Sequence, residues 1–328
     1  MNQNPETKNL REMIIATLAY HDILEMPLTA VEIWRYLIQS KDLVFFTSLK
    51  EVENELCRFV EERVVFFQNG YFAFPGREKL INRRIRRHAL AQKKWKRLRR
   101  VAWFLQMIPF LSSIAVSGSL SREAAKKDSD LDVLLITSPG RIWTVRFIIT
   151  VLLDFFGIRR RPTGPTKDLV CLNHYISSDA LHLPYQSLYT AIEYARIVPL
   201  YGEKGVWKFR EINSGWMRKY LSQVLPDFSS NLKSVPNFKI FNFIKWIGEK
   251  MLSGKFGEKI ENSLGRMQKE KISKNSEVQS SGGRIVASSL HLEFHPHSHE
   301  APLLDEFNRK MCALGLLDFS GQKDSGLS

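Results

Sequence analysis

Apolar residues at helical spacing predict three helices in the first quarter of the chain. The first covers the apolar positions of residues 13–23. Thr29 and Glu32 lie three residues apart, as do Ser48 and Glu51. Each pair has the composition of a capping box, in which two side chains bond each other's backbone amides at a helix start. The two pairs therefore predict where the second and third helices begin.

Strand-forming residues follow the third helix. Residues 63–67 and 71–74 are rich in valine and aromatic residues, and Asn69-Gly70 between them favours a tight turn, so a β-hairpin is predicted. Three helices followed by a hairpin resemble a winged helix, which we expect as a small domain over residues 8–78. Winged helices often bind DNA through the third helix, but an acidic helix repels phosphate, so packing or protein contact is favoured here. The glutamates of that helix region are Glu51, Glu53, Glu55, Glu61 and Glu62.

Positive charge is concentrated in one segment. The formal net charge is +14, and Arg83–Arg100 contains ten lysines and arginines and no acidic residue. We expect a basic connecting helix over residues 79–111. Its cations could contact a polyanion such as RNA, whereas the alternative is a solvated helix whose arginines cover apolar neighbours.

Two apolar runs in the middle of the chain carry polar residues at their ends. Residues 114–116 predict a buried strand that runs into Gly118 and Ser119, where glycine lets backbone amides approach an anion. Asp130 and Asp132 begin the next apolar run. Residues two apart on a strand point to the same side, so the two carboxylates would project together and require a cation. Mg²⁺, which prefers oxygen ligands and substrate phosphates, suits such a pair.

These residues resemble the signature of the DNA polymerase beta-like nucleotidyltransferase superfamily. The signature consists of a Gly-Ser pair, an arginine three residues after the serine and, after a gap, Ser-Asp-x-Asp on the second strand. Here these are Gly118-Ser119, Arg122 and Ser129-Asp130-Leu131-Asp132, with Glu123 where many members have glycine. The resemblance covers about residues 112–176. The alternative interpretation is a Gly-Ser turn and a solvated polar cap on a buried strand.

The resemblance implies a two-metal, Mg²⁺-dependent enzyme that moves a nucleoside monophosphate from a nucleoside triphosphate to an acceptor. Asp130 and Asp132 would bind the two ions, and the acceptor would attack the α-phosphorus and release pyrophosphate. The residues expected at the nucleotide are Gly118, Ser119, Arg122 and Ser129. The family also has a third catalytic carboxylate on a later strand. Asp168 is the only acid in the strand predicted at 167–176, and Asn173 is a neutral alternative.

The remaining pattern completes an α+β class: a mixed sheet flanked by helices over residues 112–228, then a helical C-terminal region over 229–328 with a mobile loop near 273–283. Glu193 interrupts an apolar helical pattern and is interpreted as a buried polar group or a substrate ligand. A basic amphipathic helix is also predicted, with packing on the body favoured over contact with a membrane surface. Its apolar stripe is Ile240, Ile244, Ile247 and Met251.

Neither a membrane span nor a secretory signal is expected. The apolar residues 142–158 include Arg146 and Asp154 and fall short of the about 20 apolar residues that a bilayer needs, so a core helix is predicted. The polar N-terminus and three widely separated cysteines predict a cytoplasmic protein with free thiols.

Two functions remain open. The first is a nucleotidyltransferase, for which a protein side chain, a small molecule such as an aminoglycoside, or an RNA end would serve as acceptor. The second is an inactive regulator that binds nucleotide, or binds DNA through the winged helix. The position of the third carboxylate distinguishes them.

Overall fold

A six-stranded mixed sheet forms the centre of the structure, a computed structural model that describes residues 5–40, 46–161, 163–224, 233–274, 284–295 and 298–319. The strand order is β6-β3-β4-β5-β8-β7, and only β4 and β5 are parallel neighbours. The strands are β3 (Leu111–Val116), β4 (Leu131–Thr137), β5 (Val170–Ser177), β6 (Val198–Tyr201), β7 (Arg284–Ala287) and β8 (His291–His295). The mixed α+β class predicted from the sequence is confirmed.

The N-terminal segment contains the predicted three helices and hairpin. They are α1 (Pro5–Ile23), α2 (Ala30–Arg35), α3 (Leu49–Glu61), β1 (Phe66–Gln68) and β2 (Tyr71–Ala73). Both predicted capping boxes are formed, at Thr29 and at Ser48. Asn69 and Gly70 have positive φ angles of 52° and 81°, as a tight hairpin turn requires. The order of elements is confirmed, and the assignment as a winged helix stays a prediction.

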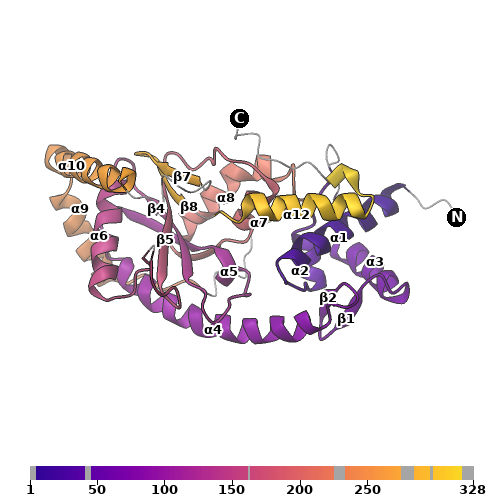
Figure 1. Ribbon diagram of the computed structural model, residues 1–328. Coiled ribbons are helices and arrows are strands. Elements are labelled where there is room, and N and C mark those ends of the chain that lie inside the picture. The colour runs from indigo at the N-terminus through magenta and orange to yellow at the C-terminus, as the bar shows by residue number, and fades with distance from the viewer. Residues whose placement is uncertain are drawn as a thin grey trace.

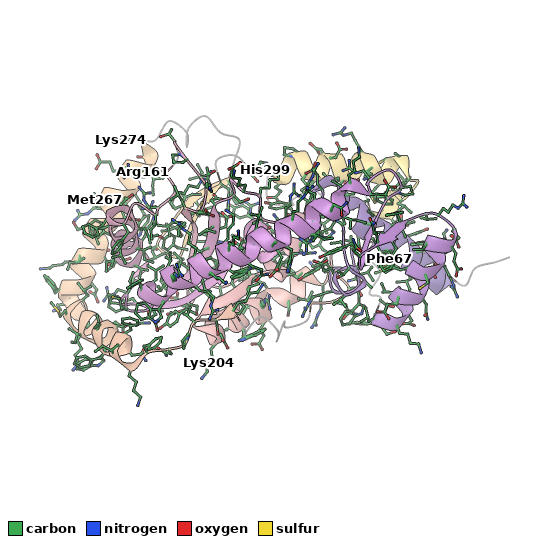
Figure 2. All side chains as sticks on the ribbon, turned by 90° about the horizontal axis from the view of Figure 1, so that it is seen from below. Phe67, Arg161, Lys204, Met267, Lys274 and His299 are labelled. Carbon is green, nitrogen blue, oxygen red and sulfur yellow. The ribbon has the colours of Figure 1, made fainter. Side chains whose placement is uncertain are left out.

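The basic segment forms α4 (Lys79–Leu105), a 27-residue helix. It runs along the lower edge of the molecule, under both the N-terminal helices and the sheet (Figure 1). Seen from below, it crosses the face nearest to the viewer (Figure 2). Apolar side chains such as Trp95 and Leu98 are buried against the sheet, so α4 connects the two halves of the molecule through its packing.

Side chains of β4 alternate between two hydrophobic cores. Leu134 and Ile136 lie in the core that also contains the N-terminal helices, whereas Val133 and Leu135 lie in the core beneath α4 and α6. Residues 8–78 therefore share one continuous core with the sheet. The other helices are α5 (Gly118–Ser121), α6 (Ile142–Phe155), α7 (Leu188–Ala195), α8 (Glu203–Met217), α9 (Lys239–Met251), α10 (Gly254–Ser273), α12 (Glu300–Ala313) and the 3₁₀-helix η2 (Leu317–Phe319).

The C-terminal region differs from its prediction as a helical region. Strands β7 and β8 extend the central sheet, and Leu292 of β8 pairs with Tyr175 of β5. The sequence alternates there between apolar residues and histidine or glutamate, which is the period of a strand. Most of the loop predicted near 273–283 lies outside the described residues. Within the described chain, no helix is long and apolar enough to cross a membrane.

Candidate functional site

Two aspartates from the start of β4 meet β5 at one edge of the parallel strand pair. Asp130 directly precedes β4, and Asp132 pairs in register with Cys171 of β5. One ligand atom from each of these three residues lies within 4.8 Å of those of the other two. In the described part of the chain they form the one such group of at least three acidic, cysteine or histidine residues. The predicted projection of the two carboxylates to a common point is therefore consistent with the geometry.

The Gly-Ser turn lies directly against this carboxylate pair. Gly118 has a φ of +66°, and a Cβ atom there would lie 2.3 Å from Oδ2 of Asp132. The amide of Ser117 donates to the carbonyl oxygen of Asp132 at 3.1 Å, which fixes the turn to the start of β4. Glycine is required at position 118 for two reasons, because both the left-handed backbone and the close approach exclude a side chain. Ser119 follows in the first turn of α5.

Negative charge accumulates around Asp132. Burial, the charge of Asp130 and the charge of Glu193 raise the pKa of Asp132 to about 7. Asn173 donates from Nδ2 to Oδ1 of Asp132 at 3.1 Å, so a neutral amide is the partner that β5 supplies. A divalent cation between the aspartates would remove the repulsion that raises this pKa.

Glu193 of α7 lies on the other side of Gly118, at the place where a phosphate is expected. Its Oε1 atom accepts from the amide of Gly118 at 2.5 Å, and its Oε2 atom accepts from Nη1 of Arg122 at 2.8 Å. The backbone amide and the guanidinium predicted to bind phosphate thus hold an internal carboxylate. The sequence predicts Glu193 as a buried polar group or a substrate ligand, and no pattern in it predicts this contact across 75 positions.

Asp168 is held away from the aspartate pair by α4. Its φ of +59° belongs to a turn before β5, and its carboxylate accepts from Nζ of Lys94 at 2.6 Å. Lys94 also donates to the carbonyl of Ser129 at 2.7 Å, and the Ser129 hydroxyl accepts from the amide of Lys126 at 2.9 Å. Lys94 therefore joins Asp168, in the turn before β5, to Ser129, in the loop before β4. Cys171 and Asn173 are the β5 residues at the aspartates.

Arg160 is a site residue for which the sequence favours a solvated helix end, with contact to phosphate or substrate as the alternative. Its Nη1 atom lies 2.8 Å from Oδ2 of Asp130 and 3.3 Å from Sγ of Cys171. Arg159 forms a parallel β-bridge with Val170, which brings the segment alongside β5 and places Arg160 beside Asp130.

The donor set suits a hard cation. Burial and the two nearby carboxylates raise the pKa of the Cys171 thiol, and its sulfur already accepts from Nη1 of Arg160 at 3.3 Å. Asp130 and Asp132 offer carboxylate oxygens, and the buried Oδ1 atom of Asn173 has no hydrogen-bond partner. Oxygen ligands of this kind fit Mg²⁺ better than Zn²⁺. The residues present thus suit the predicted metal, with Asn173 in the part expected of Asp168.

Several basic residues of α4 bond other residues of the protein. Arg84 donates to the carbonyl of Arg122 at 2.6 Å and to Glu32 at 2.9 Å, and Arg83 and Arg87 pair with Glu25. With Lys94, four of the ten basic residues thus have internal partners. The other six are exposed: Arg86, Lys93, Lys96, Arg97, Arg99 and Arg100. These six are the residues available for the predicted polyanion contact.

Comparisons of the chain with known protein families, with curated proteins and with solved structures give no match. The functional argument therefore rests on the geometry of the site.

Proposed function

We propose that this protein binds a Mg²⁺–nucleoside triphosphate complex between the Gly118 turn and the aspartate pair, and transfers the nucleoside monophosphate to an acceptor. One observation carries the proposal: Gly118 is held so close to Asp132 that a Cβ atom would lie 2.3 Å from the carboxylate. Phosphate bound at the Gly118 amide would therefore lie beside the two carboxylates. This adjacency is what phosphoryl transfer with metal ions requires.

The residues expected to contact metal or phosphate each have a defined part in the proposed reaction. Asp130 and Asp132 hold the metal, with the Asn173 oxygen as a neutral ligand. Mg²⁺ bound there would offset the charge of the aspartates and of the triphosphate. Arg122 and the amide of Gly118 take phosphate oxygens in place of the Glu193 carboxylate. An acceptor oxygen or nitrogen then forms a bond to the α-phosphorus, the bond to the β-phosphate oxygen breaks, and pyrophosphate leaves.

Glu193 takes the acceptor's proton in this proposal. Asp168 is bonded to Lys94, so the role that the family resemblance assigned to it falls to another carboxylate. The charge of Glu193 contributes to the raised pKa of Asp132, which indicates that the two carboxylates are close enough to interact. A phosphate bound at Gly118 would displace Glu193. Its carboxylate would then lie near the site without binding the metal, so it could accept the proton.

Two residues of β5, Cys171 and Asn173, favour a second function. Cys171 and Asn173 stand where a catalytic carboxylate is expected, and a chain that lacks this carboxylate can bind a nucleotide without transferring it. Such a regulator would keep the Gly118 turn and the aspartates for Mg²⁺–nucleotide binding. The acidic third helix α3 argues against DNA contact through that helix.

Pyrophosphate release distinguishes the two functions. Wild-type protein and the Asp130→Ala/Asp132→Ala double variant are incubated with Mg²⁺, each of the four ribonucleoside triphosphates, and cell extract as a source of acceptor. Release by wild type that is lost in the double variant supports transfer and identifies the base. Metal-dependent binding without release supports the regulator. Absence of metal-dependent binding contradicts both.

A further inference from the structure

Helix α9 turns its polar side toward the protein and its apolar side toward solvent. Lys245 donates from Nζ to the carbonyl of Leu111 at 2.5 Å, and Glu249 accepts the amide of Phe110 at 2.9 Å. Gly248 lies against Pro109, and Phe241, the one buried residue of α9, packs against Trp103. Polar contacts and this single aromatic residue thus attach the helix, whereas an ordinary surface helix packs its apolar stripe inward.

The outer side of α9 is a continuous apolar surface. Its residues recur at helical spacing, and their exposed fractions run from 39% for Ile247 to 69% for Met251. We name this surface the α9 apolar face: Ile240, Phe243, Ile244, Trp246, Ile247 and Met251. Phe256, just after the helix, is also exposed. The favoured sequence interpretation, packing of this stripe on the body, is wrong, because the stripe faces away from the body.

An exposed surface of this kind indicates a binding partner, since contiguous apolar patches on a protein surface mark contact sites. Figure 1 shows α9 at the edge of the molecule farthest from α1–α3. Met267 of the neighbouring helix α10 projects from the same end (Figure 2). The patch is therefore open to a large, flat partner.

The charge around the α9 apolar face indicates which kind of partner fits it. Between residues 238 and 260, the exposed ionised side chains are four lysines and one glutamate: Lys239, Lys250, Lys255, Lys259 and Glu258. Lys250 lies 4.9 Å from the ring centroid of Trp246, so positive charge borders the apolar surface. A second copy of the chain would bring like charges together there. An anionic lipid surface would complement them and take up the apolar side chains.

We propose that α9 lies in the headgroup region of a bilayer that contains anionic lipids, with the α9 apolar face inserted. The helix has 13 residues, a length of about 20 Å, so it lies along the surface and does not span. Trp246 and Phe243 stack with centroids 6.0 Å apart, and aromatic rings are enriched at this depth of a membrane. The proposal does not depend on the nucleotide site, which is built from α5, β4, β5 and α7.

Flotation with lipid vesicles tests the proposal. The full chain is mixed with phosphatidylcholine vesicles, with or without phosphatidylserine, and centrifuged through a density gradient. We expect wild type to float with the phosphatidylserine vesicles, to float much less with phosphatidylcholine alone, and to be released by high salt. The Phe243→Ser/Trp246→Ser variant should lose at least tenfold in vesicle partition, and Lys250→Glu/Lys255→Glu should lose binding to the anionic vesicles.

A matched control changes apolar residues of similar exposure at the other end of the molecule. Val31 and Phe67 are 47% and 48% exposed, and Val31→Ser/Phe67→Ser should float like wild type. Unchanged thermal unfolding of the α9 variants shows that they fold. The proposal is overturned if wild type does not float with anionic vesicles, or if the α9 variant floats equally well. A lipid-free dimer that the α9 substitutions dissociate would assign the surface to self-association and would also overturn it.

Discussion

The aspartate side and the anion-binding side of the candidate site differ in their electrostatics. On the aspartate side, Arg160 pairs with Asp130, but Asp132 receives only a neutral amide from Asn173, and the pKa of Asp132 rises to about 7. On the anion side, the amide of Gly118 and the guanidinium of Arg122 already donate to the Glu193 carboxylate. The aspartate side therefore keeps an excess of negative charge despite Arg160, whereas the other side already holds an anion.

This difference indicates how a metal–nucleotide complex would bind. A metal–nucleotide complex brings the cation that the aspartates need and a phosphate that competes with Glu193. The free energy gained at the aspartates offsets the displacement of Glu193, so metal and nucleotide should bind together far better than either does alone. Changes on the two sides should therefore have opposite effects on nucleotide affinity.

The largest expected effect comes from Gly118→Ala, which disturbs both sides. The added Cβ would clash with Asp132 Oδ2 in a left-handed backbone. We expect a loss of about 2–4 kcal/mol in the free energy of unfolding and loss of Mg²⁺–nucleotide binding, measured by denaturant titration and calorimetry. Gly140→Ala is the matched control, because Gly140 has a φ of +62° and no atom within 4 Å of an added Cβ. Equal effects of the two substitutions would refute the close approach.

The next effect is a pH dependence that belongs to the aspartate side. The pKa of Asp132 is about 7 in the folded protein against about 3.9 in an unfolded chain, so the folded state binds the proton more tightly. Stability should therefore fall as pH rises from about 4 to about 7. Asp132→Asn removes this cost and should be more stable than wild type by about 1–3 kcal/mol at pH 8, but not at pH 4. Parallel stability curves of the two proteins would show that this carboxyl is not perturbed.

A smaller effect of opposite sign is expected on the anion side. Glu193→Gln removes the charge that competes with phosphate at Gly118 and Arg122, so nucleotide affinity should rise about tenfold, equivalent to about 1.4 kcal/mol. Transfer should fall, because the proposed proton acceptor is lost. Glu211→Gln, on the exposed surface of α8, is the control and should change neither quantity. Weaker nucleotide binding by Glu193→Gln would mean that Glu193 supports binding and does not compete with it.

The smallest effect on binding is expected for Asp168→Asn. Its carboxylate is bonded to Lys94, so Mg²⁺–nucleotide affinity should stay within about twofold of wild type, while thermal stability falls by about 1 kcal/mol. Isothermal calorimetry and thermal unfolding measure the two quantities. A hundredfold loss of affinity would restore Asp168 to the metal site.

Local patterns in the sequence predicted the parts of this molecule that depend on nearby residues. The capping boxes at Thr29 and Ser48, the Asn69-Gly70 turn and the projection of the two aspartates follow from spacing along a helix, turn or strand. Each is settled by neighbours within a few positions, so single-sequence reasoning reaches it.

The features that local patterns did not predict depend on contacts between segments far apart in the sequence. Glu193 reaches Gly118 across 75 positions, and Lys94 draws Asp168 away across 74. Asp168 lies in a left-handed turn before β5 and not on the strand itself. Strand β8 has the alternating pattern of a strand, but its place in the sheet depends on pairing with β5, as between Leu292 and Tyr175. No local pattern predicts these contacts between distant segments.

The most direct test of the central claim is calorimetric titration of the protein with a non-hydrolysable nucleoside triphosphate, with Mg²⁺ and with EDTA. Wild type is compared with Asp130→Asn/Asp132→Asn, which keeps the shape of both side chains and removes both charges. The account predicts binding by wild type that requires Mg²⁺ and is lost in the double variant. Binding that is independent of metal, or that the double variant retains, would contradict it.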